Sequence, residues 1–346
     1  MKPDFQTSWK SPSNIALIKY WGKHGIQLPN NPSLSMTLNK ANTFTRIKAY
    51  RLDSGIQVKY YFEKKQRVDF EKKILKYLQK LIDDMPFINE YAFEINSSNS
   101  FPHSTGIASS ASSMSALALC LVSLENYVLK KDYSDEAFYN RASYIARLGS
   151  GSASRSVYGG WCTWGKIEGV PDSSNLYASP LNSPVDSLFD NMGDAVLVVS
   201  SSPKSVSSSM GHSLMNVHPF AKSRYLQAEE NLQALMVAMQ VGDFDSFSSI
   251  VENEALTLHS LLMTSSPDGL LLKPGTIQII EAVRKYRAQT GVKICFTIDA
   301  GPNVHILYAK NEEQKVYQFI NSDLLAFCEK SYWIDDKAGS GPEQME

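Results

Sequence analysis

The chain has 346 residues, of which 43% are hydrophobic and 20% are charged. At roughly 150 residues per domain this length suggests two domains or one large one, and the composition excludes a disordered chain, a collagen-like repeat and a small disulfide scaffold. The formal net charge is -1, so the whole chain has no electrostatic reason to bind nucleic acid or an anionic membrane surface. Any anion site must therefore be a local cluster.

The cysteines are widely spaced and form no CxxC pair, which favours buried free thiols in a reducing compartment over a zinc site. The N-terminal segment MKPDFQTSWK has no apolar core of signal-peptide length. The apolar stretch around residues 116–122 is far shorter than the roughly 20 residues that span a bilayer. These features predict a soluble cytoplasmic protein. The cysteines are Cys120, Cys162, Cys295 and Cys328.

The first half of the chain predicts strands with helices between them. Residues 43–50 and 56–62 alternate or are β-branched around an Asp53-Ser54-Gly55 turn, which predicts a hairpin. Apolar residues at helical spacing predict a helix over 70–85. The remaining expected elements are a strand at 91–95, a Ser/Asn-rich loop at 96–100, helices at about 107–129 and 137–148, a Gly/Ser turn at 149–152, a strand near 158–165 and a loop over 170–185.

A strongly β-forming run at 194–200 opens what we expect to be a second domain. A strand pair at 292–298 and 304–309 brackets the segment Asp299–Asn303, and the tail from Lys337 is polar and Gly-rich, which predicts a frayed end. Strands and helices mix without strict βαβ alternation, so the fold class is α+β. The expected helices are 224–241, 244–263, 276–290 and 314–328, and the expected units are an N-terminal domain 1–190, a C-terminal domain 191–336 and a flexible tail 337–346.

The segment Phe101–Ser113 follows a strand and opens a long helix. Gly106 permits close backbone approach, the amides of a first helical turn are unpaired, and the helix dipole favours an anion there. Ser109 and Ser110 add hydroxyl donors. The segment is therefore either a phosphate cradle for a nucleotide or a tightly packed small-residue helix with a serine N-cap. It is not a Walker A loop, because no Gly-Lys-[Ser/Thr] follows.

A second motif, Ser11–Lys23, is an apolar strand that ends in Lys19, Tyr20 and Lys23. Two lysines and a tyrosine at a strand end are able to clamp a phosphorylated substrate. The alternative is an ordinary amphipathic edge strand with solvated lysines.

A third motif, Gly149-Ser-Gly-Ser-Ala-Ser-Arg155, combines a backbone free to wrap an anion with one planar guanidinium. Arg155 either binds a carboxylate or phosphate there, or is an exposed arginine on a loop between a helix and a strand.

A fourth motif, Phe296–Asn303, places Asp299 at the end of an apolar strand before a Gly-Pro turn. A partly buried lone acid is a candidate base, and the alternative is a carboxylate that caps the turn.

A serine run at 204–211 is either a lid or anion-binding segment, or a plain solvated loop. His103 lies inside the phosphate-cradle motif. The other histidines show no metal spacing and are expected to be structural or surface groups; they are His24, His212, His218, His259 and His305.

Taken together, these motifs resemble one family, the diphosphomevalonate decarboxylases of the GHMP kinase superfamily. Asn14-Ile-Ala-Leu-Ile-Lys-Tyr-Trp-Gly-Lys23 is the most specific match, and the others follow in family order as far as Asn303. The resemblance implies a two-domain fold, a ribosomal S5 domain 2-like half and an α/β-sandwich half, with the site in the cleft between them. It also implies a homodimer that uses ATP and Mg²⁺ to convert 5-diphosphomevalonate into isopentenyl diphosphate, CO2, ADP and phosphate.

The resemblance also assigns roles by motif position. Asp299 matches the residue beside the substrate's 3-hydroxyl, Lys19 the lysine near it, and Arg155 the arginine on the substrate carboxylate. No segment is a metal motif, so Mg²⁺ is expected through ATP, with Ser110 as the candidate side-chain ligand. The remaining matches are Tyr20, Lys23, Ser152 and Ser208 for the substrate, and Ser104, Gly106, Ala108, Ser109 and Ser110 for the nucleotide phosphates.

Three positions depart from the family pattern. His103-Ser104-Thr105 stands where Thr-Ala-Ala is usual, Ser154 where cysteine is common, and Met210-Gly211-His212 where Gly-Met is usual. The alternatives to the full reaction are a mevalonate 3-kinase, a phosphomevalonate decarboxylase, or a non-catalytic binding protein of the same fold. The joint presence of the acid, the lysine and the arginine favours the full reaction.

Overall fold

The computed structural model describes residues 2–101, 109–202, 208–266 and 269–345. Its larger sheet has the order β14-β1-β4-β7-β5-β6, with β8 paired to β4 and β9 paired to β8. Neighbouring strands are antiparallel except β5 and β7, which are parallel. The strands are β1 (Phe5–Ile18), β4 (Ser33–Arg51), β5 (Gln57–Phe62), β6 (Lys65–Gln66), β7 (Tyr91–Asn99), β8 (Trp161–Trp164), β9 (Ala178–Pro180) and β14 (Glu343–Gln344), beside a small hairpin of β2 (Lys23–His24) and β3 (Leu28–Pro29).

The predicted hairpin of residues 43–50 and 56–62 is wrong, because β7 lies between β4 and β5. The predicted loop at 96–100 is also wrong, since residues 96–99 continue β7 opposite β4. The polar side chains there pair across the strands: Thr43 Oγ1 donates to Asn99 Oδ1 at 2.9 Å, and Thr45 Oγ1 lies 3.2 Å from Ser97 Oγ. Cross-strand pairing of this kind stabilises a polar strand that local composition assigns to a loop.

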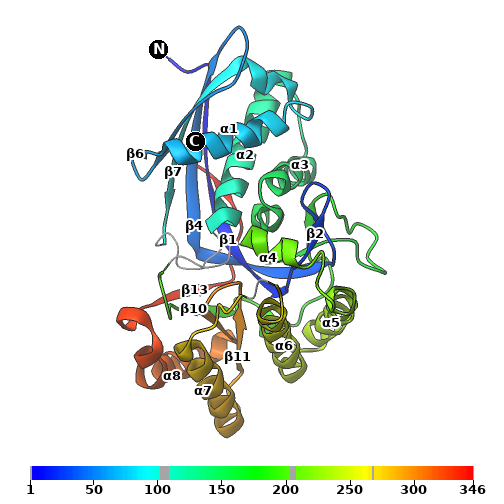
Figure 1. Ribbon diagram of the computed structural model, residues 1–346, viewed down its shortest axis with the longest axis vertical. Helices are drawn as coiled ribbons and strands as arrows, with labels where there is room; N and C mark the ends of the chain where they lie inside the picture. The colour runs from blue at the N-terminus through cyan, green and yellow to red at the C-terminus, as the bar shows by residue number, and fades with distance from the viewer. Residues whose placement is uncertain (1, 102–108, 203–207, 267–268, 346) are drawn as a thin grey trace.

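Helices α1 (Val68–Lys80), α2 (Ser109–Leu129) and α3 (Asp135–Gly149) pack on one face of this sheet (Figure 1). The α1 helix ends earlier than predicted, and a short 3-10 helix η1 (Pro86–Glu90) precedes β7. The α2 helix is long and apolar enough to cross a membrane by length and composition. Its residues 116–122 are fully buried among β1, β4 and α3, so it is a core helix.

The Gly/Ser turn after α3 begins a 3-10 helix, η2 (Gly151–Val157), and the strand expected near 158–165 is β8. The expected loop at 170–185 holds the short strand β9.

The second half is built on a smaller antiparallel sheet of order β11-β12-β10-β13. The predicted pairing of β11 with β12 is confirmed, and α6 and α7 pack on β11. The predicted C-terminal helix is α8 followed by one π turn and 3-10 turns. The elements are β10 (Gly193–Leu197), β11 (Ile294–Ile298), β12 (Val304–Tyr308), β13 (Trp333–Lys337), α4 (Ser208–Leu214), α5 (Ala221–Val241), α6 (Phe244–Met263), α7 (Pro274–Thr290) and α8 (Glu313–Phe319).

The expectation of a frayed, flexible tail is wrong for the described residues 337–345. After β13 the chain returns to the larger sheet, where Gly339 N donates to Thr37 O at 2.8 Å and Gly160 N donates to Gly339 O at 2.8 Å. β14 then pairs with β1. The packing at Gly339 leaves no room for a side chain, since a Cβ there would lie 2.2 Å from Leu38 O. Composition does not reveal such backbone pairing with a distant sheet edge.

The two halves share a continuous apolar core. Ile15, Leu17 and Leu34 of β1 and β4 pack in the same cluster as Leu232 of α5 and Phe247 of α6. The predicted α+β class is confirmed, and all four cysteines are buried free thiols as expected. Apolar packing therefore joins the two halves beside the pocket at their junction.

Candidate active site

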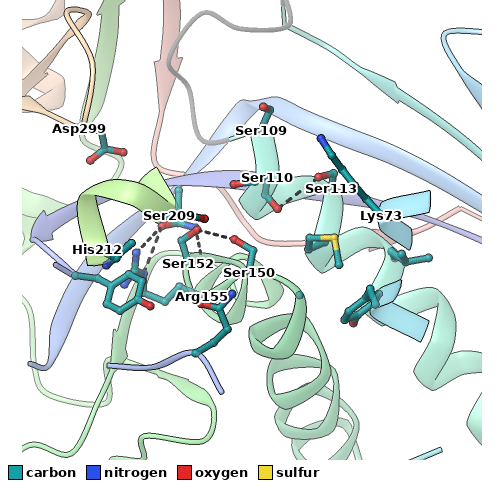
Figure 2. Close-up of a pocket in the computed structure, with 18 of the residues that line it drawn as sticks. Lys73, Ser109, Ser110, Ser113, Ser150, Ser152, Arg155, Ser209, His212 and Asp299 are labelled. Carbon is teal, nitrogen blue, oxygen red and sulfur yellow. Dashed lines mark hydrogen bonds between the residues drawn. The ribbon is translucent and has the colours of Figure 1, made fainter. Parts of the chain in front are cut away.

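One cavity of about 680 Å³ lies where the two halves meet. It gathers side chains from the end of β1, the start of α2, η2, α4 and the turn between β11 and β12 (Figure 2). The motifs that are far apart in sequence therefore converge on one pocket. Of the residues predicted for the site, the pocket is lined by Lys19, Tyr20, Lys23, Ser109, Ser110, Ser152, Arg155 and Asp299. Ser104, Gly106 and Ala108 lie outside the described residues, as does the side chain of Ser208, whose backbone begins α4.

Lys19 and Asp299 form an ion pair across the pocket. The register of β1 against β4 shifts between Pro12 and Asn14 and again between Ala16 and Ile18, and such bulges re-aim the side chains that follow. Lys19 Nζ lies 2.8 Å from Asp299 Oδ1; the lysine side chain is 1% exposed and the aspartate 28%. The carboxylate therefore has a buried cationic partner on one side and remains accessible from the pocket on the other.

The turn that carries Asp299 is held by groups other than its carboxylate. Gly301 N donates to Asp299 O at 2.6 Å, and His259 Nε2 lies 3.1 Å from the same oxygen. Asn303 Oδ1 accepts from Ser200 N at 2.9 Å. These contacts fix the backbone of the turn, so the carboxylate is available for the ion pair.

A buried charge network from the second half holds the backbone of Lys19. Its amide donates to Glu254 Oε2 at 2.9 Å, and Arg224 Nη2 donates to its carbonyl at 3.2 Å. Arg224 and Glu254 form a two-point ion pair of 2.7 and 2.5 Å, and Asn231 donates to the same carboxylate. Sequence reasoning missed this network, although Glu254 is an acid within the apolar run of α6 and in that position signals a buried partner.

Arg155 is a buried cation, not the exposed loop arginine of the alternative interpretation. It is 2% exposed. Nη1 donates to Ser33 Oγ at 2.6 Å, while Nε and Nη2 reach Asn14 Oδ1 at 3.4 Å. Burial lowers the pKa of Arg155 to about 10. Within the described part of the chain no carboxylate lies within 4 Å of it, so neutral groups orient a buried positive charge toward the pocket, where an anionic ligand would compensate it.

Tyr20 and Lys23 stand beside Arg155. The Tyr20 hydroxyl is buried without a hydrogen-bond partner among the described residues, and burial raises its pKa. Lys23 Nζ donates to Gln27 Oε1 at 2.8 Å, and burial lowers its pKa. His212, predicted to be a structural or surface group, also lines this end of the pocket. Only the packing of α4 against the end of β1 reveals its place.

The opposite end of the pocket is mostly apolar and aromatic, and sequence reasoning did not identify it. Between the two ends, Ser109 and Ser110 stand at the start of α2, where unpaired amides and the helix dipole favour an anion. Figure 2 places Ser113 and Lys73 on this side, away from Asp299. The apolar end is lined by Tyr60, Phe62, Phe70, Ile74, Tyr77, Ile95, Met114 and Leu117.

The donor set of the pocket suits anions, not a resident metal cluster. Over residues 2–101, 109–202, 208–266 and 269–345, no three His, Cys, Asp or Glu side chains come together as a metal site. The oxygen donors near the start of α2 are serine hydroxyls, which suit a Mg²⁺ ion that arrives already bound to phosphates.

Comparison with known proteins gives matches along most of the chain. The model of the diphosphomevalonate decarboxylase-like N-terminal domain matches residues 11–175, and that of the mevalonate 5-diphosphate decarboxylase C-terminal domain matches residues 195–343. The diphosphomevalonate decarboxylase of Ganoderma lucidum is 30% identical over 337 residues, which cover 91% of this chain and 81% of that protein.

Solved structures of similar fold cover 99% of this chain. The mevalonate diphosphate decarboxylase from Staphylococcus aureus has a TM-score of 0.84 and 31% identity, covering 99% of this chain and 98% of that one. The protein named MDDEF, solved in complex with MVAPP, AMPPCP and magnesium, has a TM-score of 0.83 and 28% identity, covering 99% of both chains.

Proposed function

The chain belongs to the diphosphomevalonate decarboxylase family, and we propose that it carries out the ATP-dependent decarboxylation of (R)-5-diphosphomevalonate in the pocket described above. The products are isopentenyl diphosphate, CO2, ADP and phosphate, and the enzyme uses Mg²⁺ with ATP in the mevalonate pathway of isoprenoid biosynthesis. The observation that carries the proposal is one pocket that holds the Lys19–Asp299 ion pair together with Arg155, a buried cation without a carboxylate partner among the described residues.

The first step needs a base. The 3-hydroxyl of the substrate gives its proton to the Asp299 carboxylate as its oxygen forms a bond to the γ-phosphorus and ADP leaves. Lys19, buried and 2.8 Å from that carboxylate, holds it in place and offsets the negative charge that develops on the oxygen. The exposed fraction of Asp299 faces the pocket, where the hydroxyl would lie.

The second step needs an aligned carboxylate. Phosphate leaves C3, and the bond between the carboxyl carbon and C2 breaks so that its electrons form the C2–C3 double bond and CO2 departs. Arg155 would hold the carboxylate in that alignment with its planar guanidinium, which Ser33 and Asn14 fix in turn. A cation with neutral partners is suited to bind the anion without competition.

The remaining predicted residues bind and orient the substrate and the nucleotide. We assign Tyr20, Lys23, Ser152 and Ser208 to the substrate, whose diphosphate lies far from the breaking bonds and supplies orientation. We assign Ser109 and Ser110 to the triphosphate, with Ser104, Gly106 and Ala108 from the same motif, and the aromatic end of the pocket to the nucleotide base. Mg²⁺ would sit on the triphosphate with Ser110 as its candidate side-chain ligand, where it neutralises phosphate charge.

Three features of the proposal rest on the sequence and the family. These are the domain division at 1–190 and 191–336, a homodimer, and a cytoplasmic location. Analytical ultracentrifugation at micromolar concentration tests the dimer, and limited proteolysis followed by mass spectrometry tests the domain boundary near residue 190.

The decisive experiment measures CO2 and ADP together. The purified protein is incubated with Mg²⁺ and ATP and with diphosphomevalonate, 5-phosphomevalonate or mevalonate in turn. We expect equal amounts of CO2 and ADP with diphosphomevalonate, and far less with the other two. ADP without CO2 would indicate a 3-kinase, preference for the monophosphate would indicate a phosphomevalonate decarboxylase, and neither product would indicate a non-catalytic binding protein.

A further inference from the structure

His212 lines the pocket and is held there by packing and a hydrogen bond. It lies on α4, is 7% exposed, and packs its ring against Tyr20 and Trp21, with centroid distances of 4.3 and 4.9 Å. Figure 2 shows it beside Ser209, at the same end of the pocket as Arg155. The ring is buried and contacts two aromatic side chains, so packing restricts its orientation.

The hydrogen bond at Nδ1 of His212 determines which ring nitrogen carries the proton. Gly22 N donates to His212 Nδ1 at 3.0 Å, so Nδ1 is an acceptor and carries no proton. Burial, together with the nearby charges of Lys23 and Arg155, lowers the pKa of His212 to about 3, so the ring is neutral. The single ring proton is therefore on Nε2. No described residue accepts from that nitrogen, and it lies on the ring edge opposite the Gly22 amide.

The pocket wall near His212 carries positive charge and one hydroxyl without a partner among the described residues. Tyr20 contributes a buried hydroxyl without a partner among the described side chains, and Lys23 and Arg155 contribute positive charge. A buried hydroxyl without a partner is costly, and one that stands beside two cations without a carboxylate partner within 4 Å in the described part of the chain indicates a ligand with several acceptor oxygens. A phosphate group has this chemistry, and a neutral donor binds it without adding a third like charge beside Lys23 and Arg155.

We propose that His212 donates its Nε2–H to a phosphate oxygen of the substrate's diphosphate and so helps to determine specificity for that group. The inference rests on the proposed function, because it takes the diphosphate to lie beside Tyr20 and Lys23. His212 is also one of the positions where the chain departs from the motif that it otherwise resembles. The contact would be a property of this chain's own sequence.

A pair of substitutions separates binding from a structural role. His212→Asn keeps an acceptor near the position of Nδ1 for the Gly22 amide but removes the distal donor, whereas His212→Gln places an amide N–H near the position of Nε2 and removes the acceptor. We measure the Kd for diphosphomevalonate by calorimetry without ATP, and the KM from CO2 release. Ser213→Ala, an exposed change on the same helix, is the matched control.

If the inference is right, the Kd of the Asn variant for diphosphomevalonate rises at least about 10-fold, as expected for loss of a hydrogen bond to a charged group. The Kd of the Gln variant stays within about 3-fold of that of the wild type. Equal binding by all variants overturns it, as does a larger loss in the Gln variant, which is the result for a residue that only caps Gly22.

A measurement on the wild type keeps the test independent of folding in the variants. The Nε2–H proton resonance of His212, assigned by its absence from the spectrum of either variant, should move downfield on addition of diphosphomevalonate, and an unchanged resonance at saturation contradicts the inference. Failure of the proposed function is distinct, because the wild type would then release no CO2 from diphosphomevalonate.

Discussion

The two ends of the pocket are built on different principles. At the end that holds Asp299, charges are buried and each is positioned by groups from distant parts of the chain: Lys19 by Asp299, Glu254 and Arg224, and Arg155 by Asn14 and Ser33. At the other end, apolar and aromatic side chains come from β5, α1, β7 and α2, all within the first half. A buried charge needs a specific partner, whereas an apolar surface needs only contact.

This difference predicts how each end responds to substitution. Loss of one member of a charge network leaves its partner uncompensated and misplaces the reacting groups, so effects at the charged end should be large and confined to catalysis or substrate binding. Loss of one ring from an aromatic wall removes part of a contact area, so effects at the aromatic end should be small and confined to the nucleotide. Substitutions at the two ends test that contrast.

Asp299→Asn should lower kcat by about 10²–10⁴-fold, the usual contribution of a general base. The amide has the shape of the carboxylate and lacks its basicity. Steady-state CO2 release measures the loss, and calorimetry with AMPPCP should show nucleotide binding within about 3-fold of wild type. Turnover near the wild-type rate would remove Asp299 from the mechanism and would make the charged end a structural feature.

Arg155→Lys should reduce kcat/KM by about 100-fold, equivalent to about 2.7 kcal/mol, since lysine keeps the charge and loses the planar fork. Arg155→Gln should be worse. Because no carboxylate in the described ranges pairs with Arg155, the Gln variant removes an uncompensated buried charge, and we expect its Tm without ligands to be no lower than that of the wild type.

The matched control for Arg155 is Arg67→Lys, the same change in an exposed ion pair with Asp69. It should leave both kcat/KM and Tm unchanged, as surface pairs contribute little. A strong loss of Tm with wild-type activity in the Arg155 variants would show that the buried arginine is a structural element and not a carboxylate anchor.

Lys23→Ala should raise the KM for diphosphomevalonate by about 10- to 100-fold, the value of a charge-assisted contact of roughly 1.5–3 kcal/mol. The KM for ATP should stay within about 2-fold. Lys40→Ala, which removes an exposed lysine paired with Asp335, controls for loss of one positive charge. If the KM for ATP rose instead, Lys23 would belong to the nucleotide end and the division of the pocket would be wrong.

Phe70→Ala should have the smallest effect, a rise of about 5-fold in the KM for ATP, comparable to the ~1 kcal/mol of an aromatic contact. Phe70 is half-buried and lies 5.6 Å from Tyr60, ring centroid to centroid. The KM for diphosphomevalonate should not change. Val68→Ala, an exposed change on the same helix, is the control. A shift in both KM values would indicate that the two ends are coupled through α1.

Local patterns predicted much of the fold. The α6 boundaries Phe244–Met263 and the pairing of β11 with β12 agree with the sequence, because helical periodicity and a tight turn are properties of neighbouring residues. The prediction of a hairpin at 43–62 was wrong because β4 pairs instead with β7, about 40 residues further along the chain. No local sequence signal indicates pairing between such distant strands. The prediction of a frayed tail was wrong for the same reason, because the strand that pairs with it lies near the N-terminus.

By itself the sequence determined the chemistry of the site: the residue types of the four motifs, their order, and the family to which the chain belongs. Only the tertiary structure decided their environment. It buried Arg155 against Ser33 and Asn14, paired Lys19 with Asp299 across 280 positions, and placed His212, expected to be a structural or surface group, in the pocket wall. The physical reason is that burial and charge pairing depend on which residues come close in space. The residues next to a side chain in sequence do not indicate a partner from a distant part of the chain.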